Sequence, residues 1–143
     1  DQAEPSSRRS SGAAGSFVGK ASLDLPLSFE DTKQAGVTLG SGVVLVLDDS
    51  VPIEPILSRI AAFFRDESCG QCVPCRVGTV RQQELITRLV KKSPQGGLDA
   101  ELALLRELGQ VMRDASICGL GQTASNAIES AVERLGAFRG GEP

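Results

Sequence analysis

Three of the four cysteines in this chain lie within one short stretch, ESCGQCVPCRVG at residues 67–78. They are Cys69, Cys72 and Cys75, and the fourth, Cys118, follows far downstream in SICGLGQTA. Cysteine thiolates bind zinc and iron–sulfur clusters, and the chain contains no histidine that could share such a site. The spacing therefore predicts a metal or redox centre built from sulfur ligands alone.

A 4Fe–4S cluster is the group that this spacing favours. A C-x-x-C-x-x-C loop can hold three corners of the cluster, and a cysteine from elsewhere in the chain, here Cys118, can supply the fourth. Gly70 permits a tight turn in the loop, and Pro74 fixes its backbone and removes one amide donor. Arg76 follows the third thiol, so its positive charge is expected to raise the reduction potential.

Three other interpretations of the cysteines remain open from the residues themselves. Structural zinc also takes four thiolates, although zinc sites usually come as two separate C-x-x-C pairs. A thioredoxin-like redox pair would need a preceding strand and would leave Cys75 without a role. Buried structural cysteines with this spacing would be a coincidence. A zinc-stapled structural or interaction module is the main alternative.

The second half of the sequence predicts four amphipathic helices, at about 50–64, 74–92, 98–114 and 123–138. The apolar positions expected to face inward are Ile53, Ile56, Ile60, Phe63 or Phe64, Val80, Leu85, Ile86, Leu89, Leu102, Leu105, Leu108, Met112, Ile128, Ala131, Val132 and Leu135. Short links make an up-and-down four-helix bundle over residues 50–140, with both cysteine segments at one end. The predicted class is mainly α, with a small partial α+β segment in front.

The first third of the sequence is expected to have two parts. Residues 1–15 are rich in Ser, Gly and Ala and predict a flexible leader. In residues 16–49, Ser28 and Asp31 have the spacing of a capping box at the start of a short helix that ends at Gly36. Residues 42–49 predict a buried strand, with a partner from residues 15–19 or from a sheet that this chain does not complete.

Composition excludes several classes of function. The net charge is −3 and the pI is near 5.0, which gives no basic surface for nucleic acid. No run of about 18 apolar residues predicts a membrane span, so no direct membrane insertion is expected. The N-terminal residues lack the apolar core of a secretory signal, and the clustered cysteines favour a reducing, cytoplasmic compartment. No serine has a histidine to activate it, so no catalytic residue is assigned.

The cysteine segments carry a family resemblance. ESCGQCVPCRVG resembles the cluster-binding signature E-S-C-G-x-C-x-P-C-R-x-G of the flavin- and NADH-binding subunit of respiratory NADH dehydrogenase (complex I). SICGLGQTA resembles the segment of that family that supplies the fourth ligand, and residues 23–49 resemble the end of its small β-grasp domain. Related subunits serve NAD-linked formate dehydrogenases and bidirectional hydrogenases. The resemblance covers about residues 14–138.

The resemblance implies a part in an NAD(H)-linked oxidoreductase. Cys69, Cys72, Cys75 and Cys118 would hold a 4Fe–4S cluster that takes electrons from flavin and relays them onward. The expected partners are a 2Fe–2S subunit and a further iron–sulfur, molybdenum or hydrogenase subunit. The family's FMN- and NADH-binding segments have no counterpart here, so FMN and NAD are expected in a missing N-terminal domain or a partner chain. The chain is accordingly expected to be a C-terminal piece, and a complete enzyme with an unrecognised flavin site is a further alternative.

The immediate surroundings of the cluster are expected to come from the residues next to the cysteines. These are Pro74, Arg76, Ile117 and Leu120, which would limit access of water and set the potential.

Overall fold

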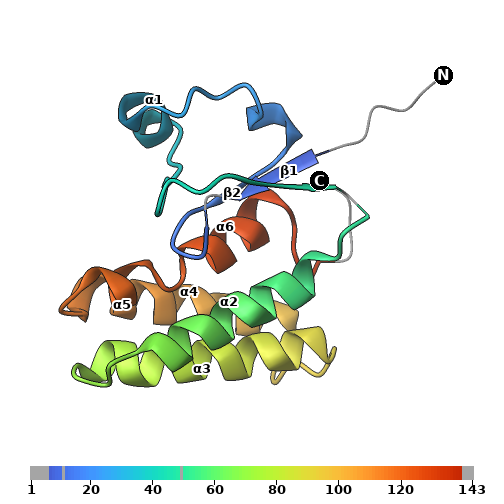
Figure 1. The fold of residues 1–143 in the computed structure, drawn as a ribbon. Helices are drawn as coiled ribbons and strands as arrows, with labels where there is room; N and C mark the ends of the chain where they lie inside the picture. Colours follow the sequence, from blue (N-terminus) through green and yellow to red (C-terminus); the bar gives the residue numbers. More distant parts are fainter. Residues whose placement is uncertain (1–6, 11, 49, 140–143) are drawn as a thin grey trace.

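The computed structural model describes residues 7–10, 12–48 and 50–139, and they form a mainly helical fold (Figure 1). Its helices are α1 (Phe29–Gln34), α2 (Ile53–Glu67), α3 (Val73–Val90), α4 (Leu98–Ala115), α5 (Gly119–Thr123) and α6 (Asn126–Arg134), with one 3-10 turn, η1 (Lys20–Ser22). The strands are β1 (Ser7–Ser10), β2 (Phe17–Val18) and β3 (Leu45–Asp48). The mainly α class predicted from the sequence is confirmed.

Helix α1 begins and ends as its sequence predicts. The Asp31 amide donates to the Ser28 hydroxyl oxygen over 3.0 Å, which satisfies one of the unpaired amides at the helix start. The Ser28 hydroxyl in turn donates to the Asp31 carboxylate over 2.5 Å. Gly36 follows the helix with a φ of +64°, a left-handed conformation that glycine adopts without steric cost. The predicted cap and stop are both confirmed.

The strands form one antiparallel sheet in the order β2-β1-β3. Two expectations are wrong here. The segment predicted as a flexible leader contains the central strand, β1, whose backbone pairs with both neighbouring strands. Residues 1–6 and 11 of that segment lie outside the described residues. The predicted buried strand at 42–49 is β3, but Leu45 and Val46 are 48% and 57% exposed, and Leu47 is the apolar residue of this strand that packs on the helical core.

Helices α2, α3, α4 and α6 pack around an aliphatic core (Figure 1). Helix α3 contacts α2 and α4, and α6 contacts α2 and α4 from the other side. The fully buried aliphatic members are Leu57, Leu85, Ile86, Leu102, Leu105 and Ile128. One predicted inward position is wrong, because Val80 is 37% exposed. The prediction of Phe63 or Phe64 is confirmed at Phe64, which is buried, whereas Phe63 is 48% exposed. Leu57 and Ala61 also face inward from α2.

The fourth predicted helix, at about 123–138, is α6, which ends earlier, at Arg134, and a separate short helix, α5, precedes it. Helix α5 ends at Thr123, and α6 begins at Asn126. The break coincides with a tertiary hydrogen bond, since Gln82 Nε2 of α3 donates to the Ala124 carbonyl over 3.0 Å. The break lets α5 carry the second cysteine segment toward α3 while α6 keeps its apolar face in the core.

The N-terminal segment lies against α6 (Figure 1). The Phe17 amide donates to the Ser130 hydroxyl over 2.8 Å, and the Phe17 side chain is fully buried in the helical core. Arg134 at the end of α6 donates to the Ala35 and Gly36 carbonyls over 3.2 and 2.8 Å. The sheet and the helices therefore share one core.

A buried ion pair joins α3 to α4. Arg88 donates two hydrogen bonds to the Glu101 carboxylate, of 2.7 and 2.8 Å, and the Gln95 amide donates a third over 2.8 Å. Glu101 is only 2% exposed. The Arg88 hydrogen bonds, more than the opposing effect of burial, lower the pKa of Glu101, and the same pairing raises the pKa of Arg88. The pair fixes the link between the two helices.

Over the described residues, none of the helices is both long enough and apolar enough to cross a membrane.

Candidate metal centre

The first three cysteines lie where α2 passes into α3. Helix α2 ends at Glu67, and the backbone becomes extended at Ser68. Gly70 turns the chain with a φ of +73°, and Cys72 is the residue that precedes the first turn of α3. Cys75 lies inside that first turn, which Pro74 also occupies without loss of a helical hydrogen bond. Cys69 and Cys72 are therefore loop residues, and Cys75 is anchored on a helix.

The loop is closed by the arginine that follows Cys75. Arg76 Nη1 donates to the Gly70 carbonyl over 3.2 Å, across the turn that contains Cys72. The side chain is exposed, and its cation lies over the loop without a carboxylate partner among the described contacts. A net-negative group held by the loop would therefore meet a positive charge.

Cys118 lies where α4 passes into α5. Helix α4 ends at Ala115, Ser116 adopts an extended conformation, and Cys118 precedes the first residue of α5. Gln122 Nε2 reaches back from α5 to the Ser116 carbonyl over 3.0 Å. This hydrogen bond holds the turn that presents Cys118.

The two cysteine segments are in contact. The Ile117 amide donates to the Cys72 thiol and is the largest cause of the lowered pKa of that thiol, followed by the Cys75 amide. A Cβ at Gly121 would lie 2.9 Å from the Cys75 Cβ, so α5 approaches α3 closely only because residue 121 has no side chain. The shared end that the sequence predicts for both segments is therefore observed.

The four thiols differ in exposure. Cys75 is buried, Cys72 is half-buried, Cys69 and Cys118 are exposed, and none forms a disulfide. The structure brings Cys72 and Cys75 together beneath the Ile117 amide. Within the described part of the chain, no three Cys, Asp, Glu or His side chains are arranged as a ready metal site. Cys69 and Cys118 lie on the loops that precede α3 and α5.

The chemistry of this end of the molecule fits an anionic, sulfur-containing group. Backbone amides donate to Cys72, a hydroxyl lies 3.3 Å from the Cys75 sulfur, and the Arg76 cation lies over the loop. The Ser116 hydroxyl oxygen is buried and forms no well-aligned hydrogen bond among the described residues, although it contributes to the lowered pKa of the Cys72 thiol. Donors beside reduced thiols are what a cluster with negatively charged sulfur would require.

The other predicted site residues occupy different positions around the loops. Pro74 and Leu120 are half-buried, and Leu120 packs on the small apolar cluster that contains Phe64 and Met112. The Ile117 side chain is 75% exposed, so its amide rather than its side chain is directed at a cysteine.

Sequence reasoning missed the residues that hold the loops in place. Ser68, Ser116 and Gly121 contact the cysteines or each other, and Gly78 admits Met112 of α4 beside α3. All four lie within the two cysteine segments, Ser68 and Gly78 in the first and Ser116 and Gly121 in the second, but their residue types alone did not indicate these contacts. The contacts of Ser116 and Gly121 depend on helices that are distant in sequence.

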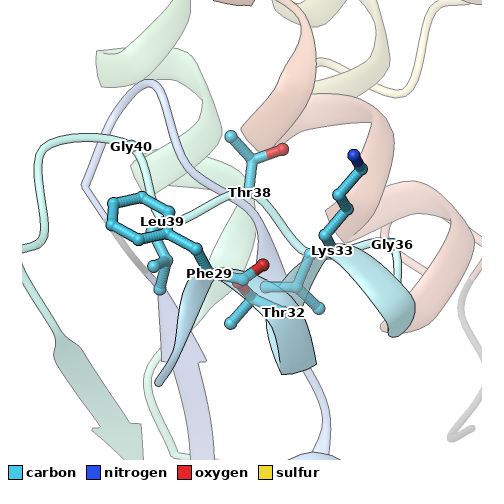
Figure 2. A pocket seen from close by; sticks show the side chains of 8 residues that line it. Phe29, Thr32, Lys33, Gly36, Thr38, Leu39 and Gly40 are labelled. Carbon is cyan, nitrogen blue, oxygen red and sulfur yellow. The ribbon is translucent and has the colours of Figure 1, made fainter. Parts of the chain in front are cut away.

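A separate pocket lies between α1 and the loop after it (Figure 2). Its volume is about 500 Å³, and its lining residues are Phe29, Thr32, Lys33, Gly36, Val37, Thr38, Leu39 and Gly40. No cysteine lines it. The pocket is therefore distinct from the cysteine loops.

The comparisons with known proteins concern the same helices. Residues 55–137 match the family described as the NADH-ubiquinone oxidoreductase-F iron-sulfur binding region. The chain is 32% identical over 122 residues to the NADP-reducing hydrogenase subunit HndC of Solidesulfovibrio fructosivorans, covering 85% of this chain and 24% of that one. It is 35% identical over 109 residues to an NADH-quinone oxidoreductase subunit of Rickettsia bellii, covering 76% of this chain and 25% of that one.

A solved structure has the same fold. A chain of the NAD+-reducing [NiFe]-hydrogenase in the H2-reduced state superposes with a TM-score of 0.78 at 28% identity. The match covers 94% of this chain and 22% of that chain. The chain thus spans about a quarter of the length of the relatives that it matches.

Proposed function

Because the chain belongs to the family of NADH-ubiquinone oxidoreductase-F iron–sulfur binding regions, whose cofactor is a 4Fe–4S cluster, we propose that it is an electron-transfer module. Cys69, Cys72, Cys75 and Cys118 would be the ligands. When bound, the cluster would supply one-electron transfer. The observation that carries this proposal is the contact between the two cysteine segments, in which a Cβ at Gly121 would lie only 2.9 Å from the Cys75 Cβ.

The residues around the cysteines have separate parts in this proposal. The amides of Ile117 and Cys75 donate to the Cys72 sulfur and stabilise its thiolate form. Arg76 closes the first loop and adds a positive charge, which favours the more negative, reduced state. Pro74 and Leu120 would limit access of water from the side of the helices.

The helices would serve as the frame for these loops. In the proposal, residues 50–140 are the cluster-binding unit, and α2, α3, α4 and α6 act as a four-helix bundle whose one end carries both cysteine segments. The Arg88–Glu101 pair fixes the far end of α3 against α4. The order of the elements supports this division, because each cysteine segment directly follows a long core helix.

The source and destination of the electrons would lie outside this chain. The relatives are named as subunits of an NADP-reducing hydrogenase and of an NADH-quinone oxidoreductase. We infer that FMN and NAD bind to a separate domain or chain, and that further iron–sulfur subunits accept the electrons. The module would then work in the reducing cytoplasmic compartment, within a multi-subunit oxidoreductase.

Metal analysis tests the proposal. The chain purified without oxygen should be brown, absorb broadly near ~400 nm, and hold about four irons and four sulfides. A zinc-stapled module would instead be colourless, with one zinc per chain and no sulfide, and that result would overturn the proposal. Titration with FMN is the second measurement: tight, stoichiometric binding would favour a complete flavin enzyme over a relay module.

A further inference from the structure

The Cys75 sulfur has a hydroxyl neighbour at the end of α2. Ser68 Oγ lies 3.3 Å from Cys75 Sγ, a distance at which either atom can donate. The Gly70 amide donates to Ser68 Oγ over 3.4 Å. This bond uses a lone pair of the Ser68 oxygen, so the hydroxyl hydrogen remains available for the Cys75 sulfur. A thiolate has no hydrogen of its own, so with Cys75 ionised the serine must be the donor.

A second hydroxyl lies on the opposite side, in the Cys118 segment. Ser116 is 6% exposed, and its hydroxyl oxygen forms no well-aligned hydrogen bond among the described residues, although it lies close enough to the Cys72 sulfur to contribute to the lowered pKa of that thiol. The Cβ atoms of Ser116 and Cys75 lie 2.6 and 2.9 Å from the position that a Cβ of Gly121 would take, so the three residues meet at one point. A buried hydroxyl without a well-aligned hydrogen bond carries a free-energy cost, which a sulfur acceptor in the site would remove.

We propose that the Ser68 and Ser116 hydroxyls donate hydrogen bonds to sulfur at the cluster, Ser68 to the Cys75 thiolate and Ser116 to sulfur on the Cys72 side, and thereby raise the reduction potential. This inference rests on the proposed function, because it needs the cluster. Neither serine is a ligand; both are positioning and tuning residues. The two donors come from opposite loops, so each segment supplies one hydroxyl as well as its cysteines.

The direction of the effect follows from charge. Reduction adds an electron to the cluster and makes its sulfur atoms more negative. A hydrogen bond to a more negative acceptor is stronger, so the hydroxyls stabilise the reduced state more than the oxidised state. Removal of either hydroxyl should therefore lower the potential.

The test measures the midpoint potential of the full chain by an EPR-monitored redox titration, together with iron and sulfide content. Ser68→Ala and Ser116→Ala should each keep the cluster. Each should lower the equilibrium constant for its reduction threefold to tenfold, which lowers the midpoint potential by about 30 to 60 mV for one electron. Ser68→Thr restores a hydroxyl and should return the potential toward the original value.

Ser130→Ala is the matched control. Ser130 is a buried serine of α6 whose hydroxyl bonds only to backbone groups, and 7% of its surface is exposed. Its loss should lower the stability of the chain but leave the potential unchanged. A shift in Ser130→Ala as large as in Ser68→Ala would mean that loosened packing moves the potential, and it would overturn the inference.

The cluster-free protein gives a readout that separates tuning from packing. Because Ser116 forms no well-aligned hydrogen bond there, Ser116→Ala should change the unfolding free energy of the cluster-free chain little. A large loss of stability would assign Ser116 a structural role and overturn its part in the inference. Unchanged potentials in both alanine variants with full iron and sulfide would overturn the inference alone. An original chain that holds no iron or sulfide would overturn the proposed function as well.

Discussion

Met112 of α4 packs directly on the bare backbone of Gly78 in α3. A Cβ at residue 78 would lie 2.5 Å from Met112 Cγ and 2.6 Å from Met112 Sδ, which is closer than real Cβ atoms come to another atom. Met112 is fully buried, and it belongs to the small apolar cluster beneath the cysteine loops. The glycine that ends the cysteine signature is therefore a packing residue, because it sets how closely α4 approaches α3.

Gly78→Ala should destabilise the chain although alanine favours helix. Alanine gains about 1 kcal/mol of helix propensity in a helix interior, but overpacking against Met112 costs roughly 1–3 kcal/mol. We expect a net loss in the free energy of unfolding, measured by urea denaturation. The variant should also lose iron more quickly under a chelator, since α3 and α4 each lead into or out of a cysteine loop.

Gly119→Ala is the matched control for that variant. Gly119 is also helical, but a Cβ there would meet nothing within 4 Å. It should therefore be neutral or slightly stabilising. Equal effects of the two substitutions would show that the Met112 contact is not the cause. A double variant, Gly78→Ala with Met112→Ala, should lose less stability than the sum of the two single losses, because the collision is removed.

Loss of Cys118 tests the fourth ligand. Cys118→Ala should lose most of its iron and sulfide and melt at a lower temperature, because three thiolates remain and the metal no longer ties the two segments together. Iron and sulfide analysis with thermal denaturation gives the readout. Leu104→Ala, at a half-exposed position of α4 away from the loops, should keep its cluster. Full iron and sulfide in Cys118→Ala would show that another residue completes the site.

The sequence predicted most of the helices well, because they depend on local patterns, and it predicted the convergence of the cysteine segments because each segment lies at a joint between two such helices. Leu85, Leu102 and Ile128 recur at helical spacing and are fully buried. The Ser28 cap is set by residues within one turn and was equally predictable. Where the apolar pattern left a choice between neighbours, as for Phe63 and Phe64, only the packing of α2 decided it.

The wrong or missing predictions all concern contacts between residues that are distant in the chain. Strand β1 has a leader-like composition, and it is ordered by pairing with β2 and β3. Glu101 has the sequence position of an exposed acid in a first helical turn, yet it is buried because Arg88 reaches it from another helix. The burial of the Ser116 hydroxyl without a well-aligned hydrogen bond is visible only once α4, α5 and α3 are placed together.

The attachment of the sheet to the helices depends on one buried hydroxyl. Ser130→Ala removes the acceptor of the Phe17 amide, and a buried amide without a partner costs about 1–3 kcal/mol. We expect faster hydrogen exchange at Phe17 together with a lower free energy of unfolding. Thr123→Ala removes a hydroxyl that donates only to the Gly119 carbonyl of its own helix, and should change exchange at Phe17 little. Unchanged exchange in Ser130→Ala would show that burial of the Phe17 ring alone holds β2.

The Arg88–Glu101 pair should make stability depend on acid pH. The pKa of Glu101 is lower in the folded chain than in the unfolded chain, where it is about 4.3. The pair therefore stabilises the fold fully above that value, and this contribution is lost as the pH falls through the lower pKa of the folded state. The unfolding free energy, measured by urea denaturation from pH 7 down to pH 3, should fall at the acid end. Glu101→Gln should be less stable at pH 7 and should show a smaller fall.

At neutral pH, Arg88→Ala should lower the free energy of unfolding more than Glu101→Gln does. Arg88→Ala leaves a buried carboxylate whose charge has lost its partner, which costs roughly 3–5 kcal/mol, whereas Glu101→Gln leaves a neutral amide. The deficit of Arg88→Ala relative to the original chain should shrink as the pH falls, because protonation removes the unpaired charge. Arg81→Ala breaks an exposed pair with Glu84 and should cost at most about 1 kcal/mol with no such pH dependence. A constant deficit for Arg88→Ala between pH 7 and pH 3 would mean that packing of the arginine stem, rather than charge, stabilises this end of α3.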